Sequence, residues 1–365
     1  MRVLFYCGDA RWSGVARVML AAARGLVARE HQVVIAACGG SRLDVAARAA
    51  GVETVSIDGR SMVPAGAWDL RRVLREKFVE VAIVGSERDQ LIVSSAMRLA
   101  ERGAVLRRVP SFERLDVQRS GKLALRIASA GLLFTTEREL KEAPAAGWPI
   151  PPAVAPLGVD AARYDGVAPA GRHRLEAPHE GLLMACAYDL TGRNRIATVF
   201  RTLALLAPRH AHMHLVVYGP GSLDEDLRMH AAALGVGSSV TFIGEPEDEH
   251  EVLRAADVGW IAAGGDAAAM ACLDCMALRV PVIAERSPLT QHYVADGITG
   301  LLLAAGDPSR TASDVAECLA IADRRVAMGN AGRTRVQRDF PETAMIDGFE
   351  RAVNAAGDRA KWKTA

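Results

Sequence analysis

Two carboxylates, Asp266 and Asp274, stand eight residues apart within residues 262–285, whose middle, residues 267–278, is almost all small or apolar. Asp266 fits the N-cap of a helix, where a side-chain oxygen accepts a backbone hydrogen bond. Asp274 lies inside the apolar run, where its neighbours leave no obvious polar face. Because an unpaired buried carboxylate is costly, Asp274 must be hydrogen-bonded, protonated or facing a ligand cavity. The pattern favours a polar ligand that carries hydroxyl groups.

Two arginines, Arg193 and Arg195, follow a predicted strand and lead into a predicted helix in the segment YDLTGRNRIATVF. Guanidinium groups beside a helix N-terminus suit a diphosphate, because each offers a fixed fork of hydrogen-bond donors. A solvated basic turn is the alternative, and it is the commoner outcome for such a pair.

Three glycine turns could also approach a ligand. Gly14 opens a predicted helix after Ser13, although the sequence lacks a full G-x-G-x-x-G, and a turn capped by Ser13 is equally compatible. Gly219 directly follows a strand, as in a phosphate or nucleoside turn. Gly244 and Glu245 form a further turn after a strand.

The histidine and cysteine patterns do not favour a metal. His210, His212 and His214 alternate as on one face of a strand, yet no carboxylate or cysteine is close in the sequence. The pair Cys272 and Cys275 has no second pair at zinc-site spacing, so buried thiols are expected. We expect neither a metal nor a cofactor.

Short β-rich runs alternate with amphipathic helical stretches along most of the chain, which predicts βαβ units and parallel sheets. A segment rich in Pro, Gly and charge, residues 157–181, interrupts the alternation and is interpreted as a linker. The predicted fold class is α/β, with two Rossmann-like domains facing a central cleft. Ligands then bind at the carboxyl ends of the strands.

Composition excludes several classes of protein. The formal net charge of +1 argues against a nucleic-acid binder. No apolar run reaches the roughly 18 residues of a membrane span. The opening MRVLFYC is too short for a signal peptide and predicts a strand, so we expect a cytoplasmic protein.

The segments described above, in their order along the chain, resemble glycosyltransferase family 4, a family of retaining nucleotide-sugar enzymes of GT-B fold. PLGVDAARYD is similar to the family's PNGVD..rF at the domain junction. The most specific match is DCMALRVPVIAERSPLTQHYVADGITGLLLAAGD, which resembles EAMA.G.PVVAT..gG..E.V.dG.tGlLv..gd. The resemblance implies an acceptor-binding domain at residues 1–165, a nucleotide-sugar-binding domain at 166–345 and a returning helix at 346–365.

The resemblance also implies roles for the candidate residues. The family's E-x7-E motif falls on Asp266 and Asp274 as D-x7-D, so Asp266 would contact the transferred sugar and Asp274 the ribose hydroxyls. Arg195 fits the position of the family's diphosphate-binding Lys, with Arg193 beside it. The other expected donor contacts are Gly14, Gly219, Gly244, Glu245 and Met270.

The implied activity is metal-independent transfer of a sugar from a UDP- or GDP-sugar to an acceptor hydroxyl, with retention of configuration, in cell-envelope glycan, lipopolysaccharide or glycolipid synthesis. An alternative is a catalytically impaired GT-B protein that binds a nucleotide or a glycan. It is supported by the shorter Asp side chains, by Ala267 and Ala269 in place of family glycines, and by the lack of an assignable catalytic His. A GT-B epimerase is disfavoured, since no further catalytic acids stand out.

A basic segment, residues 101–130, lies in the expected acceptor domain and includes Arg107, Arg108 and Arg114. It could hold an anionic acceptor, or place the protein peripherally at the inner face of a membrane through anionic headgroups. A solvated helix face is an equally good interpretation. A saccharide, a lipid-linked saccharide or a small molecule could serve as acceptor.

Overall fold

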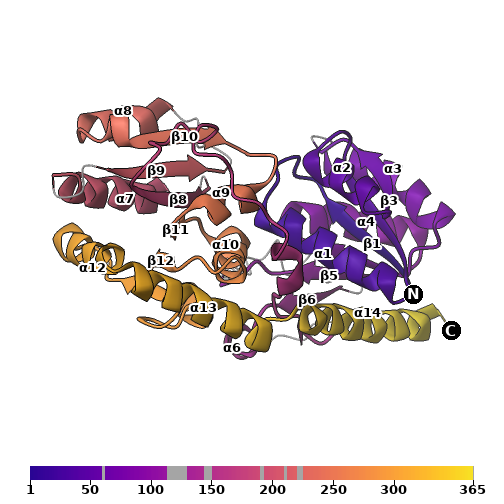
Figure 1. The fold of residues 1–365 in the computed structure, drawn as a ribbon. Helices are drawn as coiled ribbons and strands as arrows, with labels where there is room; N and C mark the ends of the chain where they lie inside the picture. Colours follow the sequence, from indigo (N-terminus) through magenta and orange to yellow (C-terminus); the bar gives the residue numbers. More distant parts are fainter. Residues whose placement is uncertain are drawn as a thin grey trace. The chain divides into compact units, whose positions relative to one another are not determined.

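A computed structural model of the protein describes the 365-residue chain except for residues 60–61, 113–129, 144–149, 190–192, 209–211, 220–224 and 365. The side chains of residues 130, 193–194 and 360–364 also lie outside the description. The chain forms two compact units (Figure 1). Unit 1 comprises Met1–Leu157 with Glu342–Ala365, and unit 2 comprises Gly158–Pro341.

Unit 1 is built on a seven-stranded parallel sheet of order β3-β2-β1-β4-β5-β6-β7. The apolar runs form buried strands, as in β1, where residues 3–7 are all buried. The strands are β1 (Arg2–Cys7), β2 (Gln32–Cys38), β3 (Glu53–Ile57), β4 (Val81–Val84), β5 (Ala104–Arg108), β6 (Ala130–Phe134) and β7 (Ala153–Val154).

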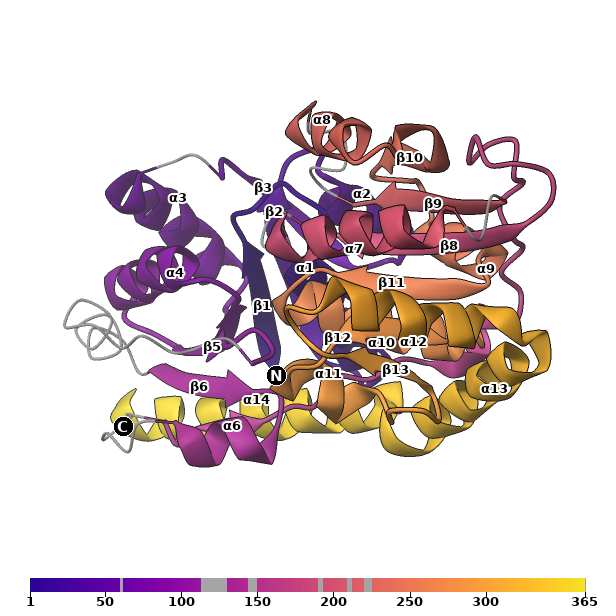
Figure 2. The same ribbon diagram turned by 90° about the vertical axis from the view of Figure 1, so that its left-hand side faces the viewer.

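Helices cover this sheet on both faces. They are α1 (Gly14–Ala28), α2 (Arg42–Ala49), α3 (Val63–Glu76), α4 (Glu87–Ala100), α6 (Glu137–Glu142) and α14 (Glu342–Thr364). The last helix, α14, packs beside α1 and against β5 and β7 (Figures 1 and 2). Its Glu350 carboxylate lies 2.9 Å from Nε2 of His31, which follows α1. The final helix of the chain is therefore part of unit 1.

Unit 2 has a six-stranded parallel sheet of order β10-β9-β8-β11-β12-β13. Its strands are β8 (Leu182–Tyr188), β9 (Met213–Tyr218), β10 (Val240–Gly244), β11 (Val258–Ala262), β12 (Val282–Glu285) and β13 (Gly300–Leu303). Its helices are η1 (Ala161–Tyr164), α7 (Arg193–Leu206), α8 (Glu225–Ala233), η3 (Gly237–Ser239), α9 (Glu249–Ala255), α10 (Gly265–Ala277), α11 (Pro288–Tyr293), α12 (Pro308–Ala320) and α13 (Ala322–Asp339).

Two helix pairs cover the sheet of unit 2. Figure 2 shows α7 and α12 side by side, and they pack against a core that includes Phe200 and Trp260. The second pair, α10 and α13, is also in contact. The predicted α/β class with two parallel, Rossmann-like sheets is confirmed.

Both sheets reverse their strand order once, between β1 and β4 in unit 1 and between β8 and β11 in unit 2. At such a topological switch point the loops that leave the two strands diverge to opposite faces, which opens a crevice at the carboxyl ends of the strands. The helices that follow these four strands are α1, α4, α7 and α10. Ligand contacts are therefore expected at the N-termini of these helices.

The units divide at 157/158 and 341/342, whereas the sequence predicted divisions at 165/166 and 345/346. Residues 158–165 belong to unit 2 because Val159 forms a parallel bridge with Pro341 and Asp165 accepts two hydrogen bonds from Arg333. Helix α14 starts at Glu342, so the second division comes where that helix begins.

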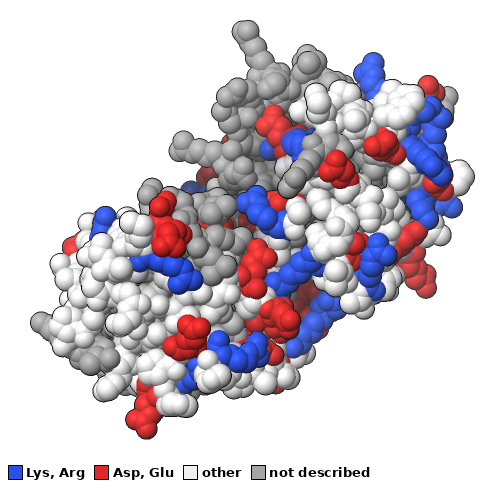
Figure 3. All heavy atoms as spheres, turned by 90° about the horizontal axis from the view of Figure 1, so that it is seen from above, with Lys and Arg blue, Asp and Glu red and all other residues white. Residues whose placement is uncertain are grey.

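Surface charge is mixed. On the face drawn in Figure 3, Lys and Arg side chains are intermixed with Asp and Glu side chains among the described residues. Among the residues that the structure describes, no helix is both long enough and apolar enough to cross a membrane.

Candidate functional site

At the switch point of unit 2, two hydrogen bonds join the segment after β8 to the loop after β11. Arg195, in the first turn of α7, donates from Nη1 to the carbonyl oxygen of Ala263 at 3.3 Å. Asp189 accepts a hydrogen bond from the backbone N–H of Gly264 at 3.3 Å. The N-termini of α7 and α10 are thus held at one edge, where backbone N–H groups and the helix dipoles favour an anion.

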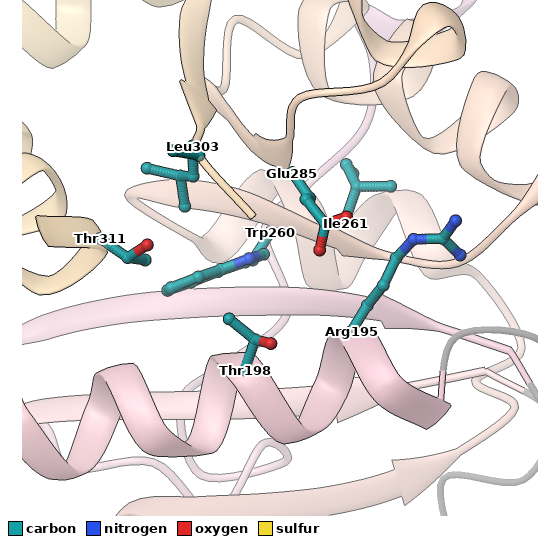
Figure 4. A pocket seen from close by; sticks show the side chains of 8 residues that line it. Arg195, Thr198, Trp260, Ile261, Glu285, Leu303 and Thr311 are labelled. Atoms are coloured by element: carbon teal, nitrogen blue, oxygen red, sulfur yellow. The ribbon is translucent and has the colours of Figure 1, made fainter. Parts of the chain in front are cut away.

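A small pocket lies beside Arg195 on the α7 and α12 side of the sheet. It is lined by Arg195, Thr198, Trp260, Ile261, Glu285, Leu303, Ala304 and Thr311 (Figure 4). Its volume of about 10 Å³ is room for roughly one water molecule. Arg195 comes from the start of α7 and Glu285 from the end of β12, so this space is a niche at the carboxyl edge of the sheet rather than a cavity for a whole sugar.

The second predicted arginine, Arg193, is the first residue of α7. The helix into which the arginines were expected to lead is therefore present. The Arg193 side chain lies outside the description, so its pairing with Arg195 at a diphosphate stays a prediction.

Asp266 does not cap its helix, contrary to the sequence prediction. Helix α10 starts at Gly265, and its N-cap is Gly264, whose backbone is extended and which has no side chain to accept a bond. Asp266 is therefore the second helical residue, and it is buried with 3% of its surface exposed. In the first turn its carboxylate still interacts favourably with the positive end of the helix dipole.

Asp274 is almost fully buried, with 1% of its surface exposed, and it has partners from two other elements. The Tyr164 hydroxyl, at the end of η1, donates to Asp274 Oδ1 at 2.7 Å. His250 Nε2, in α9, lies 3.5 Å from the same oxygen. His250 Nδ1 lies 2.9 Å from Oδ1 of Asp248, the N-cap of α9. These contacts explain how an apolar helix keeps a carboxylate.

Sequence reasoning missed Tyr164 and His250 as partners of this acid. Tyr164 is 110 residues from Asp274, and no local pattern links the two positions. The only available signals were a tyrosine where the family pattern quoted above has Phe, and a histidine inside an acidic run.

The cysteines beside Asp274 are buried, free thiols, as the sequence predicted. Burial, with a smaller contribution from the Asp274 charge, raises the pKa of Cys272 to about 12. Burial also raises the pKa of Cys275 well above its ordinary value. Thiols of this kind stay protonated near neutral pH and are poor metal ligands.

No group of three His, Cys, Asp or Glu side chains that could hold a metal occurs among the residues the structure describes. His210 falls outside that part of the chain. His214 is buried in β9 and shares a hydrogen bond of 2.9 Å with Thr241 Oγ1, and burial lowers its pKa.

Two predicted donor glycines lie together at the ends of β9 and β10. Gly219 N–H donates to the carbonyl oxygen of Gly244 at 2.8 Å. Gly219 has φ of +123°, and a Cβ there would lie 2.0 Å from the carbonyl oxygen of Tyr188. Close packing of the backbone therefore requires glycine at this position, whether or not a ligand binds.

The remaining donor candidates of unit 2 differ in exposure. Glu245 is exposed directly after Gly244, and Met270 is buried in α10, one turn beyond Asp266. Glu245 is accessible to a ligand from solvent, whereas Met270 is only 4% exposed.

Comparison with known proteins shows the family of the chain. The model of the family described as glycosyl transferases group 1 matches residues 171–335. Over 316 residues the chain is 31% identical to the GDP-mannose-dependent alpha-(1-6)-phosphatidylinositol monomannoside mannosyltransferase of Mycobacterium tuberculosis, a match that covers 81% of each protein. The chain belongs to glycosyltransferase family 4. It is therefore an enzyme of a retaining group, as the sequence predicted.

Other relatives of this glycosyltransferase match over shorter lengths or in fold alone. The lipopolysaccharide core biosynthesis glycosyltransferase LpsE of Rhizobium meliloti is 27% identical over 150 residues, which are 41% of this chain and 44% of LpsE. The crystal structure of HepE from Anabaena in complex with UDP-glucose superimposes with a TM-score of 0.79 at 12% identity, covering 97% of this chain and 100% of that chain. The predicted GT-B fold is confirmed.

In unit 1 of the glycosyltransferase, Gly14 is the first residue of α1, and Ser13 caps that helix by accepting from Ala16 N–H at 3.3 Å. Across the switch point, Asp89 in α4 accepts from Gly8 N–H at 3.3 Å. Asp89 is 5% exposed, and burial raises its pKa above the ordinary value.

The predicted basic patch of unit 1 is only partly described. Arg108, at the end of β5, is 1% exposed, so its inclusion in an exposed patch is wrong. The reason is that β5 lies between β4 and β6 in the sheet interior, with helices over both faces. Arg107 is half-buried, with Nη1 3.5 Å from Gln90 Oε1, and Arg114 lies outside the described residues.

Proposed function

We propose that this glycosyltransferase moves a sugar from a nucleotide-diphosphate sugar to an acceptor hydroxyl with retention of anomeric configuration, in cell-envelope glycan, lipopolysaccharide or glycolipid synthesis. The observation that carries the proposal is the Arg195 guanidinium, which is bonded to the loop that begins α10 and thus lies where two helix N-termini meet. By its name the mycobacterial relative uses GDP-mannose and a phosphatidylinositol acceptor, and HepE was solved with UDP-glucose, which supports this substrate class.

The donor diphosphate would lie over the N-termini of α7 and α10. Arg195, with Arg193 beside it, would stabilise the negative charge that grows on the departing diphosphate. The bond from the anomeric carbon to the phosphate oxygen breaks, and a bond to the acceptor oxygen forms on the same face of the sugar. The acceptor proton passes to the leaving phosphate. Asp266 is proposed to contact the transferred sugar.

The nucleoside would lie between α10 and the strand ends that carry Gly219 and Gly244. Glu245 would face the base, and Met270 would border the donor site from inside α10. The ribose would lie on the side of α10 that carries Asp274. No metal is required in this scheme, because the helix N-termini and the arginines neutralise the diphosphate.

Unit 1 would bind the acceptor, and Gly14 stays a proposed contact of the donor. Arg107 and Arg114 remain the proposed contacts to an anionic acceptor or to headgroups at the inner face of a membrane. A lipid-linked acceptor agrees with the phosphatidylinositol acceptor named for the mycobacterial relative.

The test is a thermal-shift screen of UDP-, GDP- and ADP-sugars, followed by assays of product formation with saccharide and glycolipid acceptors. A bound donor raises the unfolding temperature by mass action. Asp266→Asn should keep that shift and lower the transfer rate about 100-fold, as loss of one transition-state contact does. Absence of any shift with every nucleotide sugar would refute the proposal.

A nucleotide- or glycan-binding module remains the competing function, favoured by the alanines Ala267 and Ala269 in the first turns of α10. It predicts a thermal shift without product under all conditions, and no difference in any assay between wild type and Asp266→Asn.

A further inference from the structure

The carboxylate of Asp274 is covered by two side chains that are themselves partly exposed. Asp274 is 1% exposed, whereas Tyr164 is half-buried and the His250 side chain is 26% exposed. The two rings meet edge to face with centroids 4.9 Å apart. A ligand hydroxyl arriving from solvent therefore meets Tyr164 and His250 before it can meet Asp274.

We propose that the hydroxyl of Tyr164 is the group that touches the donor ribose, and that Asp274 acts from behind it. A phenolic hydroxyl donates one hydrogen bond and accepts others. Tyr164 donates to Asp274 Oδ1 at 2.7 Å, and its oxygen accepts from a ribose hydroxyl. The negative charge of Asp274 polarises the phenol and strengthens that second bond. This inference rests on the proposed donor site in unit 2.

The lengths of the side chains support this arrangement. Asp274 stands where the family pattern has Glu, so its carboxylate ends about one C–C bond, ~1.5 Å, closer to the helix. Tyr164 stands where the quoted pattern PNGVD..rF has Phe. The Tyr164 oxygen lies 2.7 Å from Asp274 Oδ1, a separation larger than the length that the shorter acid loses. The pair Asp–Tyr thus replaces the pair Glu–Phe.

The turn that carries Tyr164 is fixed on α10 at a second point. Arg333 of α13 donates to both oxygens of Asp165 at 2.8 and 2.9 Å and to the carbonyl oxygen of Ala277 at 2.6 Å. This buried arginine therefore links the residue after Tyr164 to the last residue of α10. A hydroxyl held by its neighbours in this way loses little further freedom on binding a ribose.

His250 is a positioning residue in this arrangement. It lies between Asp248 and Asp274, which face it from α9 and α10, and its ring packs against Tyr164 from the side. The imidazole fixes the orientation of the phenol and of the Asp274 carboxylate.

The test measures binding of UDP and GDP, and of their 2′-deoxy and 3′-deoxy counterparts, by calorimetry on the full chain. Wild type should prefer a ribonucleotide over at least one deoxy counterpart by about tenfold, which is the value of one hydrogen bond to a polarised group. Tyr164→Phe should reduce that preference to within about twofold and leave the affinity for that deoxynucleotide unchanged. A merely structural role would weaken both ligands equally.

Two further variants sharpen the result. Asp274→Glu in the Tyr164→Phe background should restore the preference, because the longer acid then reaches the ribose directly. Tyr293→Phe removes a phenolic hydroxyl from α11 of the same unit and should leave the preference unchanged. The unfolding temperature of each variant, measured without ligand, separates loss of fold from loss of recognition.

A full ribose preference in Tyr164→Phe overturns the inference while the proposed function stands. Wild-type protein that binds ribo- and deoxynucleotides equally also overturns it. If neither UDP nor GDP binds wild type at millimolar concentration, the proposed donor site fails and this inference fails with it.

Discussion

The two switch points of this glycosyltransferase share a topology and differ in the side chains beside them. In each, a carboxylate accepts a backbone N–H from the opposite loop at 3.3 Å, Asp89 from Gly8 in unit 1 and Asp189 from Gly264 in unit 2. Unit 2 adds the Arg195 guanidinium at the edge where α7 and α10 begin.

Two arginines beside the switch point of unit 1 have partners within that unit. Arg11 is paired with Asp9 at 2.7 Å, and Arg88 donates to the carbonyl oxygen of Gly59 at 2.6 Å. We propose that one topology supports two kinds of binding, of a diphosphate beside Arg195 in unit 2 and of an acceptor hydroxyl beside Asp89 in unit 1. The fold supplies the crevice, and the side chains at its rim decide what binds there.

Replacement of one arginine beside each switch point by alanine should show the largest difference between the units, in the affinity for UDP or GDP. Arg195→Ala removes charge-assisted bonds to the diphosphate and should weaken UDP or GDP binding about 100-fold, or ~2.7 kcal/mol. Arg88→Ala is the matched control in unit 1 and should change the affinity less than about twofold. Calorimetric titration measures both. Equal effects of the two substitutions would remove the proposed distinction between the units.

Alanine substitutions of the glycines beside the two switch points should differ in how far they lower the free energy of unfolding. Gly219→Ala places a Cβ at positive φ and 2.0 Å from a backbone oxygen, and should destabilise the fold by about 2 kcal/mol. Gly8→Ala places a Cβ 2.5 Å from the Asp89 carboxylate oxygen, a side-chain atom that can move, and should cost only about 1 kcal/mol, the hydrogen bond that it breaks.

Urea unfolding of the two glycine variants gives the comparison. A larger loss for Gly8→Ala would show that the contact between Gly8 and Asp89 is the more rigid of the two.

Substitution of Asp89, the buried acid of unit 1, should have the smallest effect on stability. Burial raises the folded-state pKa of Asp89 above its ordinary value of 3.8. The folded state then favours the protonated form, so this contribution to stability is present below the ordinary pKa and is lost as the pH rises through the folded pKa. Asp89→Asn, which cannot ionise, should be more stable than wild type by about 1 kcal/mol or less at pH 7 and gain nothing below the ordinary pKa.

The unfolding temperatures of wild type and Asp89→Asn, measured from about pH 3 to about pH 8, test this difference. An Asp89→Asn variant that is less stable than wild type by the same amount at every pH would show that hydrogen bonding by the carboxylate outweighs its desolvation.

The sequence predicted the features that depend on local pattern. Buried parallel strands follow from apolar runs such as β1, and the presence of helix α7 follows from the pattern of the segment that contains Arg193 and Arg195. The start of α10 was placed two residues late, because Asp266 is a better N-cap by residue type than Gly264, which the backbone uses.

Features that depend on distant contacts were not predictable from one sequence. The burial of Arg108 follows from the position of β5 inside the sheet, which is a property of strand order. The bond from Tyr164 to Asp274 joins residues 110 apart, and only the fold brings η1 onto α10. The division at 157/158 likewise depends on the bridge from Val159 to Pro341.

Amide hydrogen exchange of the full chain, with and without saturating UDP or GDP, tests the central claim that the switch point of unit 2 holds the nucleotide. The account predicts slower exchange in the first turns of α7 and α10, with no change at Gly8 or in the first turn of α4. Protection at the β1 and β4 edge of unit 1, with none at α7 and α10, would contradict it.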